Sequence, residues 1–143
     1  MIPFYLAAKA GKIVAVDVSE KMVERAREKF GSEPSVELRV SDALSLDESE
    51  RFDAVVIYNA YPHFFEKAAL VEKVYRLVKI GGRFVVAHGS GKDVINLHHE
   101  AVAAGVSCGL RAASEESVLW ADKFKIEALV DTPGFYAFSG VRR

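Results

Sequence analysis

Residues 12–22 read Lys-Ile-Val-Ala-Val-Asp-Val-Ser-Glu-Lys-Met, and this stretch decides the fold class. Residues 13–16 form a continuous apolar run rich in β-branched side chains, which is typical of a strand covered by helices on both faces. Ser19 is placed to cap a helix that Gly31 ends. The inward positions of that helix recur every three or four residues, at Met22, Val23, Ala26 and Phe30. The stretch therefore predicts a strand, a tight turn and a helix.

The rest of the chain continues this alternation of apolar runs and amphipathic stretches, which is the sequence pattern of an α/β fold. Five further strands are predicted, at residues 36–40, 52–58, 83–88, 124–129 and 135–141. Other helices are predicted at residues 3–9 and 93–104, and one begins at Ser114. A further helix has Leu70 on its inward face and is expected to end at the Gly81-Gly82 pair. The short connection through Pro133 and Gly134 predicts that the last two strands pair antiparallel. We expect one six-stranded sheet in a single domain, residues 1–143.

Composition narrows the class of protein before any motif is considered. Half of the 143 residues are apolar, which allows a sizeable core without disulfides or metals. The formal charge is -1, without a basic block, so nucleic acid is not indicated as a partner. Cys108 is the single cysteine, so no internal disulfide forms and no zinc motif is present. No apolar run is long enough to span a membrane, and we expect a soluble, cytoplasmic protein.

Two acidic residues follow predicted strands directly, where open parallel sheets bind their ligands. Asp17 ends the first strand, and an acid there accepts the hydroxyls of a ribose in many nucleotide-binding folds. Its alternative role is to cap the turn into the helix. Asp42 ends the second strand, where a carboxylate can accept a hydrogen bond from the amine of adenine. The alternative is that Asp42 is an ordinary loop carboxylate. Two acids at two strand ends together favour a nucleotide site.

These residues carry a resemblance to a known family that covers nearly the whole chain. Residues 12–22 resemble the second strand and following helix of class I S-adenosylmethionine-dependent methyltransferases of the ubiquinone/menaquinone-biosynthesis type. Residues 41–43 resemble the family's adenine-edge motif, and residues 52–56 its fourth strand. Residues 77–84 are similar to the helix-to-strand turn, with Ile80 where proline is common.

The resemblance implies a fold, a cofactor and a set of binding residues. The fold is a Rossmann-like three-layer sandwich with a mostly parallel sheet and an antiparallel C-terminal strand. The cofactor is S-adenosylmethionine, with the ribose on Asp17 and the adenine beside Met22. The full set of cofactor-binding residues that we expect is Asp17, Val18, Met22, Asp42, Ala43 and Asn59.

The chain departs from the family pattern at its beginning. In the family, a central strand and a glycine-rich loop precede the segment that residues 2–11 resemble, and neither is found upstream of Asp17. Without that strand two strand edges lose their partner, so we expect a rearranged sheet or a homodimer with shared elements. The possibility that Met1 is an internal start codon of a longer gene stays open.

The segments after the fourth and fifth strands supply candidate residues for the methyl acceptor. Residues 58–65 follow the fourth strand, and there Tyr61 and His63 are expected to contact the acceptor. The imidazole of His63 is also the candidate general base, because its ordinary pKa suits proton removal near neutral pH. The alternative is a histidine that only forms a hydrogen bond beside aromatic side chains that cover the sheet.

Residues 89–113 form an insertion that is expected to act as a lid or substrate wall, with Asn96 and His98 as further acceptor contacts. Imidazole and carboxylate groups near Asn96 suggest metal ligands. Adjacent histidines point apart on a helix, however, so one of His98 and His99 is expected to line the wall and the other to face solvent. No metal site is therefore predicted.

Three functions compete on these observations. The leading one is methyl transfer from S-adenosylmethionine to a small-molecule acceptor, achieved mainly by positioning. The second is a non-catalytic, oligomeric remnant or adenosine-binding module of the same fold. The third is a nicotinamide-dependent oxidoreductase, which also uses an acid after the second strand. The segment at residues 42–43 and the antiparallel C-terminal pair argue against the third.

Overall fold

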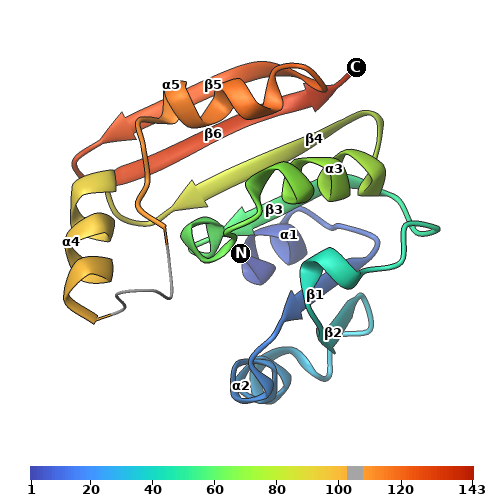
Figure 1. Ribbon diagram of the computed structural model, residues 1–143. Coiled ribbons are helices and arrows are strands. Elements are labelled where there is room, and N and C mark those ends of the chain that lie inside the picture. The colour runs from blue at the N-terminus through green and yellow to red at the C-terminus, as the bar shows by residue number, and fades with distance from the viewer. Residues whose placement is uncertain (103–107) are drawn as a thin grey trace. The chain divides into compact units, whose positions relative to one another are not determined.

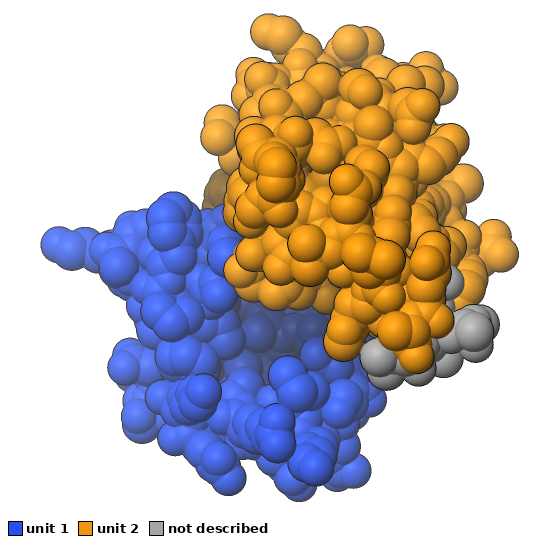
Figure 2. All heavy atoms as spheres, turned by 90° about the vertical axis from the view of Figure 1, so that its left-hand side faces the viewer, with its two compact units in different colours: residues 1–47 blue, residues 48–143 orange. Residues whose placement is uncertain are grey.

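The computed structural model describes residues 1–102 and 108–143 (Figure 1). They divide into two compact units, Met1–Asp47 and Glu48–Arg143, which Figure 2 distinguishes by colour. The mixture of helices and strands confirms the predicted α/β class. In the described part of the chain, no helix is both long and apolar enough to cross a lipid bilayer.

The first unit is built around one parallel strand pair. It comprises α1 (Ile2–Ala7), β1 (Ile13–Asp17), α2 (Glu20–Phe30), β2 (Val36–Val40) and the 3-10 turn η1 (Ala43–Ser45). Ser19 caps α2 by accepting a hydrogen bond from the Met22 N–H at 3.3 Å, and Gly31 follows its last residue. The predicted strand, cap and helix are therefore confirmed.

The first unit buries little of its apolar surface. Within residues 1–47, all of which the structure describes, Val23 is the one buried apolar residue, at 3% exposure. The strands β1 and β2 are half-buried along most of their length. This unit therefore has almost no core of its own.

The second unit holds a four-stranded sheet and the main core. Its elements are β3 (Phe52–Tyr58), η2 (Tyr61–His63), α3 (Lys67–Leu77), β4 (Val78–His88), α4 (Lys92–Val102), α5 (Ala113–Glu116), η3 (Ser117–Trp120), β5 (Phe124–Thr132) and β6 (Phe135–Arg142). The strand order is β3-β4-β6-β5, with β3 and β4 parallel. Strand β6 runs antiparallel to both of its neighbours, which confirms the predicted C-terminal pair.

An aromatic cluster forms the centre of this core. Trp120 is fully buried, and its ring stacks on that of Phe84 with 4.1 Å between centroids. Phe124 and Phe138 contact the same pair edge-on or at a tilt. Helix α3 and the turn η3 pack together and against the sheet, so the cluster is closed from that side. Burial of these large side chains fixes the sheet and thereby the ends of β3 and β4.

The boundary between α3 and β4 differs from the prediction. The helix ends at Leu77 rather than at the glycine pair, and the strand begins at Val78 rather than at residue 83. Val78 is fully buried and pairs with Phe52, so burial holds it in the strand. Gly81, at φ 76°, marks an irregularity inside the strand instead of a helix end. Helix α4 covers residues 92–102, and residues 103 and 104 of its predicted range lie outside the described residues.

The predicted six strands are present, but they form two sheets instead of one. Strands β1 and β2 make a two-stranded sheet, and the other four strands make the second sheet. Among the described residues, β1 pairs only with β2, and β3 pairs only with β4. Within this described part of the chain, β1 and β3 therefore each have one unpaired edge.

Candidate functional site

The two predicted acids meet at one edge of the first unit. Strands β1 and β2 run parallel, and Asp17 lies opposite Val40 in the last register pair. The Ser41 N–H donates to the main-chain oxygen of Asp17 at 3.1 Å, which holds the two strand ends together. Asp42 is the next residue, so both carboxylates lie at the carboxyl edge of this sheet.

Both carboxylates also have a local structural role. Asp17 Oδ1 accepts the Ser19 N–H at 2.8 Å, and Asp42 Oδ1 accepts the Leu44 N–H at 2.9 Å. For Asp17 this contact is of the capping kind that the alternative interpretation predicts, whereas Asp42, for which the alternative was an ordinary loop carboxylate, caps η1. A carboxylate has two oxygens and several acceptor positions, so capping is compatible with ligand binding.

The surroundings of these acids fit the nucleoside part of the expected cofactor. Val18 is 72% exposed and Met22 is 50% exposed, although both are apolar. Apolar side chains beside exposed carboxylates offer a surface for a flat base and acceptors for ribose hydroxyls. Ala43 begins η1, directly after Asp42. Five of the six predicted cofactor residues thus lie in the segments at the ends of β1 and β2.

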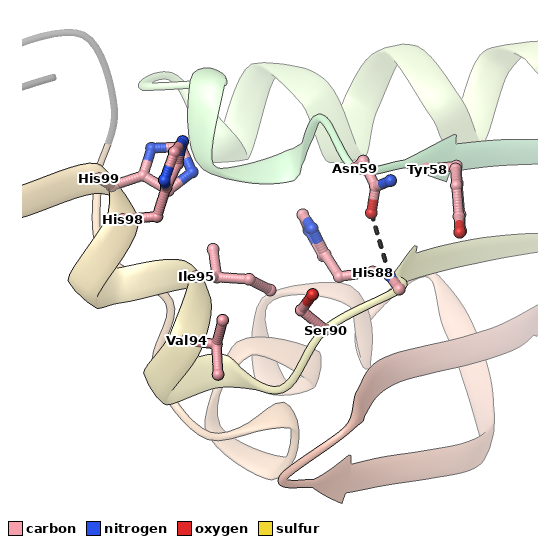
Figure 3. Close-up of a pocket in the computed structure, with 9 residues that line it drawn as sticks. Tyr58, Asn59, His88, Ser90, Val94, Ile95, His98 and His99 are labelled. Atoms are coloured by element: carbon pink, nitrogen blue, oxygen red, sulfur yellow. Dashed lines mark hydrogen bonds between the residues drawn. The ribbon is translucent and has the colours of Figure 1, made fainter. Parts of the chain in front are cut away.

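The second unit has a hollow of about 510 Å³ where β3 and β4 end against α4 (Figure 3). Its lining combines apolar, amide, hydroxyl and imidazole groups. The lining residues are Tyr58, Asn59, His88, Gly89, Ser90, Val94, Ile95, His98 and His99. The size suits a small organic molecule, and the polar groups are few and varied, as in many ligand sites.

Asn59 joins the two strand ends that form one wall of the hollow. Its backbone is left-handed, at φ 53°, directly after β3. Its N–H donates to Ala87 O at 2.9 Å, and its Oδ1 accepts the Gly89 N–H at 3.0 Å, the dashed contact in Figure 3. Asn59 thus binds the residue before His88 through its main chain and the residue after His88 through its side chain, which fixes the backbone at the end of β4.

His88 is a buried lining residue that sequence reasoning did not identify. His88 is only 3% exposed, and its Nε2 has no hydrogen-bond partner. Burial lowers the pKa of His88 to about 4, and His99 and His63 add to the same effect. The ring is therefore neutral near pH 7. A buried polar atom without a partner costs roughly 1–3 kcal/mol, which a ligand can recover.

All four histidines of the chain gather at this hollow. The rings of His63 and His99 are 5.2 Å apart, and those of His98 and His99 are 6.1 Å apart. Burial, then His63 and His98, lower the pKa of His99. The expectation that only one of His98 and His99 lines the wall is wrong, because both do. Among the described residues, no group of three or more candidate ligands is arranged to hold a metal.

Two predicted acceptor residues are held by other contacts. Tyr61 is fully buried, and its hydroxyl donates to Glu116 Oε2 at 3.1 Å, so it belongs to the core rather than to the wall of the hollow. The amide of Asn96 binds both main-chain polar groups of Leu110, at 2.8 and 3.0 Å, and so ties α4 to the segment that precedes α5. Neither is among the lining residues.

The other predicted residues lie at or beside the hollow. His98 and Asn59 line it, and His63 reaches it through its contact with His99. The signal for His88 was present in the sequence, because it is the last residue of an apolar strand, the same position that singled out Asp17. Tyr58 and Ser90, at or just after the ends of β3 and β4, follow the same rule.

Acidic side chains that follow parallel strands on an α/β framework are the arrangement in which nucleotide-binding folds hold their ligands. A family model described as a methyltransferase domain matches residues 2–82. The match covers more than half of the chain, so the chain belongs to the methyltransferase domain family. This confirms the family that residues 12–22 and 41–43 resemble.

Curated relatives agree with this family. The chain is 33% identical over 90 residues to a demethylmenaquinone methyltransferase of Clavibacter sepedonicus, which covers 62% of this chain and 37% of that protein. It is 29% identical over 127 residues to a carboxy-S-adenosyl-L-methionine synthase of Yersinia pestis (strain Pestoides F), at 80% and 47% coverage. The chain thus spans about a third to a half of the length of these relatives.

Solved structures share the fold. The PH0226 protein from Pyrococcus horikoshii OT3 superposes with a TM-score of 0.75 at 22% identity, covering 99% of this chain and 78% of that one. N-methyltransferase NodS from Bradyrhizobium japonicum WM9, in complex with S-adenosyl-L-homocysteine, gives a TM-score of 0.69 at 11% identity, with 92% and 66% coverage. At these identities the likeness shows the fold: a Rossmann-like methyltransferase architecture.

Proposed function

We propose that this chain takes part in S-adenosylmethionine-dependent methyl transfer to a small-molecule acceptor. The observation that carries the proposal is that Asp17 and Asp42 both lie at the carboxyl ends of the paired strands β1 and β2, in a chain of the methyltransferase domain family. The related methyltransferases, and the S-adenosyl-L-homocysteine held by NodS, support the cofactor. A cytoplasmic location is proposed with it, because methyl donor and small metabolites are available there.

The residues of the first unit would hold the nucleoside part of the cofactor. The carboxylate of Asp17 accepts from the ribose hydroxyls, and Asp42 accepts from the adenine amine. Val18 and Met22 supply apolar surface for the base. Bound there, the cofactor supplies an electrophilic methyl group, so the protein's main contribution is to orient the acceptor and exclude water.

The hollow of the second unit would hold the acceptor. Tyr58 and Ser90 offer hydroxyl groups, and His88 offers an uncharged imidazole, so the wall can orient an oxygen or nitrogen nucleophile. His63 stays the predicted general base, acting beside His99. Its role is to take the proton of the acceptor as the new bond to carbon forms.

Titration calorimetry with S-adenosyl-L-homocysteine tests the proposal. We expect binding in the micromolar range for the chain and its loss in Asp17→Ala. Asp53→Ala is the matched control, since that exposed carboxylate pairs with Lys79 away from both candidate sites. Absence of binding at millimolar ligand would remove the claim of methyl transfer and favour the non-catalytic, oligomeric remnant of the same fold.

We also propose that the chain forms a homodimer. The open edges of β1 and β3 support this, because unpaired strand edges tend to pair with another chain. Light scattering at increasing protein concentration is expected to give twice the 15.7 kDa chain mass. A constant monomer mass up to roughly 100 μM, far above usual dimer affinities, contradicts it.

A further inference from the structure

The side-chain amide of Asn59 lines the hollow in a fixed orientation. Its Oδ1 accepts the Gly89 N–H at 3.0 Å. Because an N–H group cannot donate to an amide NH2 group, this contact holds the oxygen at Gly89 and turns Nδ2 the other way. Figure 3 shows the oxygen pointing toward the end of β4 and the nitrogen on the side of Tyr58. No hydrogen bond among the described residues uses Nδ2, so its N–H donors are available to a ligand.

The backbone holds this donor group rigidly. Asn59 has a left-handed conformation at φ 53°, and its main-chain N–H donates to Ala87 O at 2.9 Å. Non-glycine residues held in this backbone region cluster at functional sites, where neighbouring contacts keep them in place. A donor that is already oriented loses little freedom when a ligand binds to it. The amide of Asn59 is therefore suited to recognise an acceptor atom at one defined position.

The hydroxyl of Tyr58 borders the same residue that Asn59 binds. A Cβ on Gly89 would lie 2.9 Å from the Tyr58 hydroxyl oxygen, so the absence of a side chain at Gly89 gives the phenol its room. In the part of the chain that the structure describes, this hydroxyl forms no hydrogen bond. Two consecutive residues at the end of β3 thus bring two donors, a phenol O–H and an amide NH2, to one side of the hollow.

The rest of the lining favours an uncharged ligand. No lysine, arginine, aspartate or glutamate is among the lining residues, each of which the structure describes. A carboxylate or an ammonium group would therefore lose water without gaining a counter-ion. Burial lowers the pKa of His88 to about 4, so its ring is uncharged near pH 7. Its buried Nε2 has no partner among the described residues, which is a second, independent indication of a ligand group at this hollow.

We propose that the hollow binds an uncharged small molecule through a carbonyl oxygen, which accepts hydrogen bonds from Asn59 Nδ2 and from the Tyr58 hydroxyl. A carbonyl oxygen has two lone pairs and can accept both donors. Val94 and Ile95 of α4 supply apolar surface for the body of the ligand. Asn59, which the sequence places beside the cofactor, is here assigned to the ligand of the hollow. That this ligand is the methyl acceptor rests on the proposed function, whereas its binding does not.

Acetanilide and N-ethylaniline are a matched pair of probes, because they share a skeleton in which a methylene replaces the carbonyl. Each is titrated into the isotope-labelled chain without cofactor, and proton–nitrogen NMR follows the side-chain amide signals of Asn59, which Asn59→Asp lacks. We expect acetanilide to bind about tenfold tighter than N-ethylaniline and to shift those signals, because a hydrogen bond is gained. Equal affinity of the two probes, tighter binding of benzoate than of acetanilide, or no binding of acetanilide at about 10 mM overturns the proposal.

Asn59→Asp separates recognition of a ligand from the structural role of the side chain. The carboxylate can still accept the Gly89 N–H and tolerates the left-handed backbone, but it has no N–H to donate. We expect acetanilide to bind about tenfold more weakly, and the benzamidine cation to bind more tightly than it does to the parent chain. Lys125→Gln, exposed on β5, lowers the net charge by the same amount and should change neither. If Asn59→Asp binds acetanilide as well as the parent chain does, the assignment fails.

Tyr58→Phe tests the second donor, and the same samples separate this inference from the proposed function. Loss of the hydroxyl is expected to weaken acetanilide binding about threefold to tenfold and to leave N-ethylaniline unaffected, and an equal effect on both probes would exclude Tyr58 from the carbonyl contact. Binding of S-adenosyl-L-homocysteine without a preference for acetanilide overturns the carbonyl site alone. Preference for acetanilide without binding of S-adenosyl-L-homocysteine removes the methyl-transfer proposal and leaves a site for an uncharged ligand in the second unit.

Discussion

Asn59 combines a left-handed backbone with a side-chain hydrogen bond that holds the end of β4. Asparagine tolerates this backbone region better than most residues, and glycine tolerates it best. We expect Asn59→Gly to cost about 1 kcal/mol for the lost contact with Gly89, and Asn59→Ala to cost about 2 kcal/mol because strain is added. Urea unfolding followed by the fluorescence of Trp120 measures both. Equal losses would show that the backbone conformation contributes nothing.

Glu116 is a fully buried carboxylate that joins α5 to the start of α3. Lys67 donates to it at 2.8 Å, Arg111 at 3.3 Å and Tyr61 at 3.1 Å. Removal of its charge leaves Lys67 with little solvent and no counter-ion. We expect Glu116→Gln to lower the free energy of unfolding by roughly 3 kcal/mol. Glu115→Gln, one residue earlier and exposed, is the control and should cost less than about 1 kcal/mol.

The same carboxylate should make stability depend on pH. Burial raises the pKa of Glu116, but the contacts from Lys67 and Arg111 outweigh burial and hold it below 4.5. The stability that Glu116 contributes is therefore present above pH 4.5, the ordinary value, and is lost as the pH falls through the lower pKa of the folded state. Unfolding curves from pH 7 to pH 3 should converge for the parent chain and Glu116→Gln. Parallel curves would contradict the assignment.

At the scale of elements, the position of α4 depends on a close backbone approach at Gly91. A Cβ there would lie 2.4 Å from the main-chain oxygens of Thr132 and Pro133, in the turn between β5 and β6. We expect Gly91→Ala to push α4 away and to destabilise the second unit by about 1–3 kcal/mol. Gly134→Ala, in the same turn with nothing within 4 Å, is the matched control. Unfolding curves compare them, and equal stability of the two variants would contradict the expected clash.

Sequence patterns locate elements better than they locate their contacts. The sequence predicts β2 and β3 at their observed bounds. Apolar and charged residues alternate in β2, as in a partly exposed strand, whereas β3 is a largely continuous apolar run. The end of α3 was misplaced, because long-range pairing of Val78 with Phe52 overrides the local glycine signal. Likewise Tyr61 could not be assigned to the core from its neighbours, since its partner Glu116 is 55 positions away.

For the candidate site, too, the sequence predicts the positions of residues along the chain better than the contacts between them. Strand-end positions can be read from the chain, so the sequence predicts that Asp17, Asp42 and Asn59 lie at or just after the ends of strands, and the structure places them there. The clustering of His63 with His88 and His99 depends on how η2, β4 and α4 meet, and no local pattern encodes that. The strand-end position of His88 is visible in the sequence, but its burial without a hydrogen-bond partner for Nε2 is visible only in the structure.

At the scale of the whole molecule, the two units differ sharply in how much apolar surface they bury. Apart from Val23, every buried apolar residue among those described lies in residues 48–143, together with the four-stranded sheet. A chain of 47 residues with so small a core falls below the size at which a domain is stable alone. The second unit has a complete aromatic core and a closed hydrogen-bond network around Glu116.

We therefore expect the isolated fragment of residues 48–143 to fold and the fragment of residues 1–47 to remain unfolded. Circular dichroism should show cooperative thermal unfolding for the larger fragment, with the fluorescence of Trp120 changing at the same temperature, and no transition for the smaller one. Addition of S-adenosyl-L-homocysteine should raise the midpoint of the full chain but not of the larger fragment, because Asp17 and Asp42 lie in the smaller. A cooperative transition in the smaller fragment would show that β1, β2 and α2 form a stable unit, and that burial of Val23 is not the limit to its stability.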